Sequence, residues 1–188
     1  MKDWESRPGI GRMTDLFVVY DLATRSKYCN PTSKKDALDT VSFLKKIVEY
    51  DDVRVMYSDN HVTLKKAAKL LSAAHQGSTP GVSKSNGIIE RQNQDIQDGL
   101  RAALNQAGLP ACFWAYSAPH YCHMVNTRIN PDTGTSPHFA RLGAECPSKR
   151  ILFGCGVFFI PAKTKYSISP ASMRTQFGIF LGYKMGVG

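Results

Sequence analysis

The chain has 188 residues, of which 43% are hydrophobic, and a formal net charge of +9. This hydrophobic content allows a buried core and argues against wholesale disorder. No apolar run approaches the roughly 20 residues that cross a bilayer, and the first residues lack the apolar stretch of a secretory signal. We therefore expect a soluble intracellular protein with one domain of ordinary size and a small addition.

Most of the net positive charge lies in the second half of the chain. Residues 99–188 contain nine basic and two acidic residues, whereas residues 1–98 contain 15 basic and 13 acidic residues. A basic surface favours a polyanionic partner, because the phosphates that it neutralises release their counterions. Many basic proteins bind no nucleic acid specifically, so the charge is compatible with DNA or RNA as a partner but does not select it.

The five cysteines are scattered and include no Cys-x-x-Cys pair, which favours reduced thiols over a disulfide framework. His120, Cys122 and His123 lie close together in the sequence and resemble a set of metal ligands. They fall within the apolar and aromatic stretch 113–125, where buried histidine and cysteine are commoner than ligands. The sequence therefore disfavours a zinc site there.

The first half of the chain predicts alternating strands and helices. Residues 16–20 form a β-branched and aromatic run typical of a strand, and residues 26–29 are its expected hairpin partner, ended by Asn30-Pro31. The next predicted elements are a helix at about 34–50, a strand at 53–57, a second helix capped by Thr63, and an exposed loop at 76–86.

The second half predicts mainly helix, followed by a small β appendage. In order, the expected features are a long helix from about Gly87 to Ala107, an aromatic helix over 113–126 with a kink or break at Pro119, a turn-rich connection at 130–135, and strand-like runs at 155–160 and 177–183.

Two carboxylates occupy positions that suit phosphate chemistry. Asp59 ends the predicted strand, and Glu90 lies in the first turn of the long helix, 31 positions later. A strand–helix–loop–helix path can bring both to one edge of a sheet, where α/β folds expose their chemistry. Carboxylate oxygens are the ligands that Mg²⁺ prefers, and two such ions can assist phosphoryl displacement. From spacing alone, however, a turn-capping Asp and a Glu that suits the helix dipole are the favoured interpretation.

Short segments around these two acids form distinctive motifs. They are Ser58-Asp59-Asn60 and the run 86–93, Asn-Gly-Ile-Ile-Glu-Arg-Gln-Asn. Both are similar to acid-bearing motifs of the integrase core of copia-type retrotransposons. Further similar segments follow in the family's order, and with them the resemblance covers nearly the whole chain: Leu109-Pro110, Phe113-Trp114-Ala115, Asn126-Thr127-Arg128, Thr135-Ser136-Pro137, Phe153-Gly154-Cys155 and Phe180-Leu181-Gly182-Tyr183.

The resemblance implies a ribonuclease H-like α/β fold. It predicts a mixed five-stranded sheet flanked by helices in a catalytic core-like domain, residues 1–145, and an incomplete β-barrel-like appendage in residues 148–188. In that fold the first acid lies on the first strand, ahead of the hairpin, so Asp3 is the expected third carboxylate. Asp21 matches a position that the family often fills with a non-catalytic Asp, and Asp15 is a weaker alternative.

The activity that the resemblance implies is metal-dependent DNA integration. Asp3, Asp59 and Glu90 would hold two Mg²⁺ or Mn²⁺ ions, which activate water to trim a DNA end and then that end's 3′-hydroxyl to attack target DNA. The implied partners are element ends and target DNA, bound by a homo-oligomer in the nucleus, with no membrane. Candidate DNA-contacting residues are Lys84, Asn86, Arg91 and Asn93, although the two cations are equally well interpreted as solvated surface charge.

Several features depart from the family pattern. His61-Val62 replace the usual Gly after Asp-Asn, the interval from Asp59 to Glu90 is short, and almost no residues precede Asp3. Paired His and Cys of an N-terminal zinc module are missing, and the chain stops soon after Tyr183. We therefore expect a fragment of a larger Pol polyprotein or a degenerate copy. Two alternatives remain open: a catalytically inactive DNA-binding remnant, and a ribonuclease H-like nuclease that acts on RNA.

Overall fold

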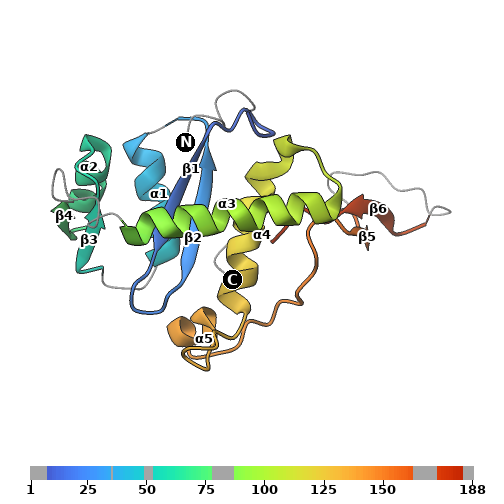
Figure 1. Cartoon of the computed structure of the whole chain (residues 1–188). Helices are drawn as coiled ribbons and strands as arrows, with labels where there is room; N and C mark the ends of the chain where they lie inside the picture. Colours follow the sequence, from blue (N-terminus) through green and yellow to red (C-terminus); the bar gives the residue numbers. More distant parts are fainter. Residues whose placement is uncertain (1–7, 35, 49–52, 78–86, 163–172, 184–188) are drawn as a thin grey trace.

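The computed structural model describes residues 8–34, 36–48, 53–77, 87–162 and 173–183, and it combines helices with short strands (Figure 1). In chain order the elements are β1 (Asp15–Tyr20), β2 (Lys27–Thr32), α1 (Ala37–Val48), β3 (Val55–Ser58), α2 (Val62–Leu70), β4 (Ala74–Gly77), α3 (Gly87–Ala107), the 3₁₀ turn η2 (Ala111–Phe113), α4 (Trp114–Thr127), α5 (Pro137–Leu142), β5 (Gly156–Phe159) and β6 (Gln176–Ile179). The fold is therefore mixed α/β, as predicted. Within these residues, no helix has the length and apolar character needed to cross a membrane.

Within the described residues the strands form three separate pairs, and the predicted five-stranded sheet is not shown. β1 pairs with β2 and β5 with β6 in antiparallel fashion, whereas β3 and β4 are parallel. In the part of the chain that the structure describes, no strand joins the β1–β2 pair to the β3–β4 pair. The expected first strand, around Asp3, falls in residues 1–7, which lie outside the described residues. The β1–β2 and β3–β4 pairs therefore remain separate among the described residues.

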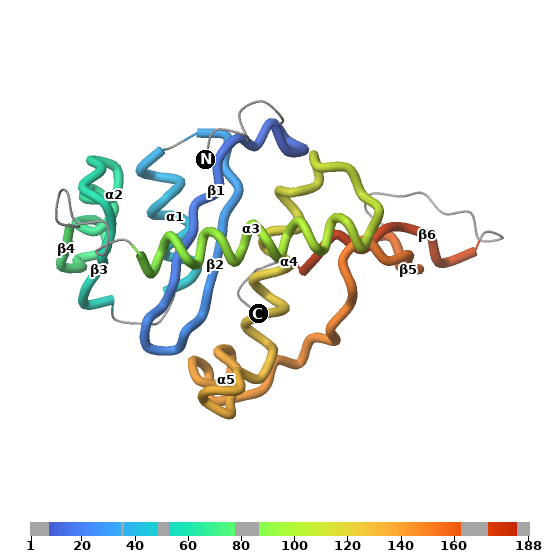
Figure 2. The backbone as a smooth tube through the Cα atoms, in the orientation of Figure 1, coloured from blue at the N-terminus to red at the C-terminus, as the bar shows by residue number. Residues whose placement is uncertain are grey.

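The β1–β2 hairpin forms the middle layer of the fold and is apolar on both faces. Successive side chains of a strand point to opposite faces. Leu16 and Val18 of β1 pack against the core that α3 and α4 form, whereas Phe17 and Val19 pack against α1 and α2. Figure 2 shows α3 crossing the hairpin. Because helices cover both faces of the hairpin, β1 contains consecutive apolar residues and does not alternate between polar and apolar ones.

The second strand of the hairpin extends further than predicted. Asn30 and Pro31, expected to end it, pair with Phe17 and Leu16 instead. A proline cannot donate a hydrogen bond to the strand ladder, so it is tolerated where a strand has a neighbour on one side only. β2 has such a free side, because β1 is its only strand partner among the described residues.

The segment from β3 to β4 is a parallel β–α–β unit, of which β4 was not predicted. β4 is only four residues long and contains a glycine, so it carries no clear strand periodicity. α2 begins two residues earlier than predicted, at Val62, because its N-cap is His61 rather than Thr63. Thr63 is thus the second residue of the helix. The Thr63 backbone N–H donates to the capping His61 Nδ1 at 3.3 Å.

The main core lies between α3 and α4. Ile96, Leu100 and Leu104 are spaced one helical turn apart on α3 and are buried together with Trp114 of α4. α4 continues through Pro119, where a kink or break was predicted, and does not end there. Because α4 is packed along α3 and β2, tertiary contacts hold it in helical form despite the missing N–H.

After β6 the chain returns to α4 through a cluster of aromatic and histidine side chains. The ring centroids of Tyr183 and His123 are 4.0 Å apart, and the Tyr183 hydroxyl accepts the N–H of Ile151 at 2.8 Å. His120 Nε2 donates to the Ile151 carbonyl at 2.9 Å. Burial lowers the pKa of both histidines, and the charges of His120 and His138 lower that of His123 further.

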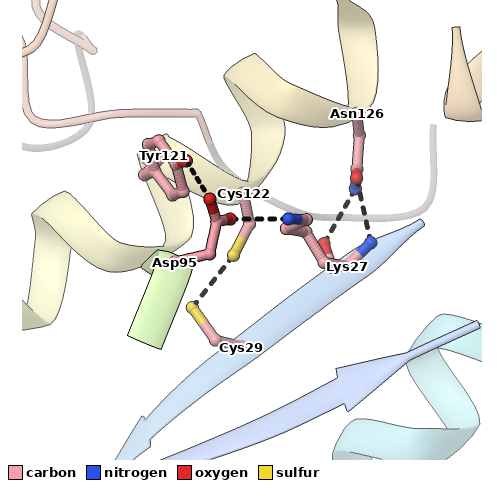
Figure 3. Close-up of polar contacts among 6 residues, drawn as sticks. All are labelled: Lys27, Cys29, Asp95, Tyr121, Cys122 and Asn126. Atoms are coloured by element: carbon pink, nitrogen blue, oxygen red, sulfur yellow. Dashed lines mark hydrogen bonds and ion pairs between the residues drawn. The ribbon is translucent and has the colours of Figure 1, made fainter. Parts of the chain in front are cut away.

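A polar network ties the hairpin to the two long helices (Figure 3). Lys27 Nζ lies 2.6 Å from Asp95 Oδ2 on α3, and Tyr121 on α4 donates to Asp95 Oδ1 at 3.1 Å. Asn126 of α4 accepts the backbone N–H of Lys27 at 3.0 Å and donates to its carbonyl at 2.9 Å, as a neighbouring strand would. Since the Lys27 side chain is only 11% exposed, Asp95 compensates a charge that water barely reaches.

We predict that Asp95→Ala destabilises the protein by about 1–2 kcal/mol, because it leaves the Lys27 ammonium buried without its carboxylate while Asp95 itself is partly screened by water. Urea unfolding measures this free energy. The matched control is Asp98→Ala, three positions further along α3, whose ion pair with Arg101 is exposed on both sides; it should cost less than about 0.5 kcal/mol. Equal effects of the two substitutions would contradict the prediction.

We also predict that the protein becomes less stable as the pH falls below the ordinary histidine range. The aromatic cluster around Tyr183 favours the neutral forms of His120 and His123. Its contribution to the free energy of unfolding is therefore complete above the unfolded pKa of 6.5 and is lost as the pH falls through the lowered pKa of the folded state. The unfolding midpoint should be lower at pH 5.5 than at pH 7.5. His123→Gln should shrink that difference. His61→Asn, an exposed site where Asn can still cap α2, should leave it in place.

Candidate functional site

Asp59 follows β3 directly, as predicted, and thus lies at the carboxyl end of the parallel strand pair. Its side chain is exposed, and its Oδ1 accepts the backbone N–H of His61 at 3.2 Å. This contact closes a short turn between β3 and α2, a geometry for which Asp is well suited. The turn therefore presents the carboxylate at the edge where both parallel strands end.

Side chains join the ends of β3 and β4 beside this turn. Ser58 Oγ lies 2.8 Å from His75 Nε2 and 3.0 Å from the carbonyl oxygen of Asp59. The Asn60 side chain lies over Gly77, the register partner of Ser58, and leaves no room there for a Cβ. The residues on either side of Asp59, Ser58 and Asn60, therefore both contact β4.

Glu90 lies in the first turn of α3, as predicted, and its side chain is exposed. The partial positive charge at a helix N-terminus stabilises a carboxylate in this position. Arg91 is exposed as well, while Asn93 is half-buried one turn after Glu90. The exposed carboxylate and guanidinium are accessible to a ligand from solvent.

The two alternative first acids serve local structure. Asp21 follows β1, and its two carboxylate oxygens accept the N–H of Ala23 at 3.0 Å and the hydroxyl of Thr24 at 2.5 Å. Asp15 accepts the hydroxyl of Thr14 at 3.1 Å. The Asp21 carboxylate is thus engaged in the hairpin turn.

Two of the three predicted metal ligands, Asp59 and Glu90, lie within the described residues. Three further predicted site residues lie outside the described part of the chain: Asp3, Lys84 and Asn86. Among the residues that are described, no three His, Cys, Asp or Glu side chains come together as a metal-binding group. The oxygens of Asp59 and Glu90 suit Mg²⁺ or Mn²⁺ chemically. The three-carboxylate site remains a prediction, because its third member is Asp3.

Cys122 lies in the core against another cysteine. Its Sγ is 3.5 Å from that of Cys29 on β2, and both residues are buried (Figure 3). Burial, and next the neighbouring thiol, raise the pKa of Cys29 well above its usual range. Since the thiolate is the form that binds metals, the raised pKa disfavours metal binding by Cys29. Cys122 is thus part of the packed core between α3 and α4.

The contact between Ser58 and His75 was not predicted from sequence. The two residues are 17 positions apart, and His75 lies on the strand that the hydrophobic pattern missed. One signal could have revealed it: an interpretation of residues 53–77 as a β–α–β unit places the second strand beside the first, which brings His75 close to β3.

The comparisons with known proteins found similarity both in sequence and in fold. No protein-family model matches the chain. Over 112 residues, 58% of this chain, the sequence is 28% identical to the retrovirus-related Pol polyprotein from transposon TNT 1-94 of Nicotiana tabacum, and the match spans 8% of that polyprotein's length. The fold is similar to that of the catalytic core domain of BIV integrase, with a TM-score of 0.53 and 17% sequence identity over 68% of this chain and 85% of that domain. The chain is therefore a homologue of a transposon's retrovirus-related Pol polyprotein, and it has a fold similar to a retroviral integrase catalytic core.

Proposed function

We propose that this chain is the catalytic core of a copia-type retrotransposon integrase, which processes DNA 3′ ends and joins them to target DNA. The observation that carries the proposal is the coincidence of homology and placement. A chain homologous to a transposon Pol polyprotein carries Asp59 at a parallel strand's carboxyl end and Glu90 in the first turn of a long helix. Both side chains are exposed and thus available to a substrate.

In the proposed site Asp3, Asp59 and Glu90 together bind Mg²⁺ or Mn²⁺, with two ions as the expected number. Bound divalent cations supply a lowered pKa for coordinated water and neutralise charge on a phosphodiester. The chain's own part is to hold carboxylates at defined positions. The turn at Asp59 does so through the His61 N–H, and α3 does so for Glu90 through its rigid first turn.

The proposed DNA contacts lie near the start of α3. Lys84, Asn86, Arg91 and Asn93 surround Glu90 in sequence, and the exposed Arg91 guanidinium is suited to a phosphate. The net charge of +9 favours the same polyanionic partner. Assembly as a homo-oligomer on DNA and a nuclear location belong to this proposal as well.

The proposal also extends to the architecture. Residues 1–145 would form the integrase core, with residues 148–188 as a separate β appendage. A strand from the start of the chain would complete the five-stranded sheet by pairing with the hairpin and with the β3–β4 pair. Such a strand would bring Asp3 next to Asp59, since neighbouring strands lie about 5 Å apart.

The test is a strand-transfer assay on the purified chain. Recessed-end duplex DNA and a circular target are incubated with Mg²⁺ or Mn²⁺, and joined products are measured. We expect metal-dependent joining that Glu90→Gln reduces by at least about a hundredfold, the upper end of the cost of disturbing a metal site's outer partners. Glu145→Gln, at an exposed position, is the matched control and should retain the activity.

Other results would identify the alternatives. DNA binding without any joining by the wild-type chain would indicate an inactive DNA-binding remnant. Cleavage of the RNA strand of an RNA–DNA hybrid, with no joining of DNA, would indicate a ribonuclease H-like nuclease.

A further inference from the structure

We propose that Ser58 and His75 are positioning residues, whose hydrogen bond between the last residue of β3 and the second residue of β4 fixes the turn that presents the Asp59 carboxylate. The inference rests on the proposed function for the role of Asp59 as a metal ligand. The positioning itself follows from contacts that the structure describes.

The first step is the direction of the hydrogen bonds. A serine hydroxyl has one proton to donate and two acceptor lone pairs. Ser58 Oγ contacts both His75 Nε2, at 2.8 Å, and the carbonyl oxygen of Asp59, at 3.0 Å. A carbonyl can only accept, so the hydroxyl proton goes to Asp59. His75 must then donate from Nε2, which assigns the Nε2–H tautomer or the doubly protonated ring to His75.

The second step is what this relay fixes. It holds the Asp59 carbonyl, and hence the orientation of the peptide between Asp59 and Asn60. The same turn closes through Asp59 Oδ1, which accepts the N–H of His61 at 3.2 Å. The backbone and the side chain of Asp59 are therefore restrained together. Loss of the relay would free the Asp59 carbonyl and loosen the position of its carboxylate.

The third step is the shelter around the relay. β3 alternates between exposed and half-buried side chains, with Met56 and Ser58 on the half-buried face. Met56 packs against the cluster of Val41, Leu44 and Ala67 from α1 and α2. His75, the register partner of Met56, is half-buried as well. A hydrogen bond partly shielded from water is stronger than an exposed one, so the relay can restrain a turn whose own contacts are exposed.

The experiment has two readouts on the full chain. The first is the exchange rate of the His61 backbone amide, measured by NMR, which reports on the turn without any metal. The second is the affinity for Mn²⁺, measured by water-proton relaxation. Ser58→Ala and His75→Leu should each accelerate exchange at His61 and weaken Mn²⁺ binding by about tenfold, the cost typical of lost outer-shell partners. The double variant should be no worse than either single variant, because both remove one relay.

Conservative variants separate positioning from general stability. Ser58→Thr keeps the hydroxyl, and His75→Gln keeps a donor near the place of Nε2, so both should approach wild-type values. His75→Asn is too short and should not rescue. If Ser58→Ala or His75→Leu fails to fold, the comparison of His75→Gln with His75→Asn still tests the positioning role. Ser42→Ala, on the exposed side of α1, is the matched control and should change neither readout.

The outcomes that overturn the proposal differ from those that overturn the proposed function. Unchanged exchange at His61 in folded Ser58→Ala and His75→Leu, or no difference between His75→Gln and His75→Asn, refutes the positioning role. Wild-type chain that shows no Mn²⁺ binding sensitive to Asp59→Asn refutes the metal site, while the exchange data still decide whether the relay orders the turn.

Discussion

The structure depends on a hairpin that must be covered on both faces. Leu16 and Val18 need one apolar partner layer, and Phe17 and Val19 need another. α3 with α4 provides the first layer, and α1 with α2 provides the second. Since burial of apolar side chains is the dominant favourable term in folding, this one strand determines that the two candidate carboxylates arise from different layers. Asp59 belongs to the α1–α2 side, whereas Glu90 begins a helix of the other side.

The edge of the hairpin imposes a second constraint, which polar groups satisfy. β2 has a strand neighbour on one side only among the described residues, and an unpaired strand edge invites unwanted pairing. The Asn126 amide occupies the backbone groups of Lys27 there, and the Lys27 side chain reaches Asp95. The Asn126 amide therefore supplies the backbone hydrogen bonds that a further strand would make at Lys27. Together with the Lys27–Asp95 ion pair, it fixes α4 and α3 relative to the hairpin.

Much of this organisation could be predicted from the sequence, and the misses have common physical causes. The long helix to Ala107, the hairpin and the strand before Asp59 follow from local periodicity, and so do the positions of Asp59 and Glu90 on their elements. β4, the extension of β2 through Pro31 and the persistence of α4 through Pro119 depend on partners distant in sequence. The Ser58–His75 contact belongs to the second group, because it requires the register of a parallel pair that only tertiary structure sets. Asp3 could be proposed only from the family resemblance and lies outside the described residues.

The two layers are unequal, and this inequality bears on how the site could work. Among the residues that the structure describes, nine buried residues from β2, α3, α4 and the C-terminal segment form the core on the Glu90 side, whereas Val41, Leu44 and Ala67 form the buried cluster on the Asp59 side. Smaller clusters open more easily than the main core, since local stability follows the apolar surface buried. The unit that carries Asp59 is thus the less firmly anchored half of any site shared with Glu90. A local restraint such as the Ser58–His75 relay matters most in that half, because packing alone positions the turn least strongly there.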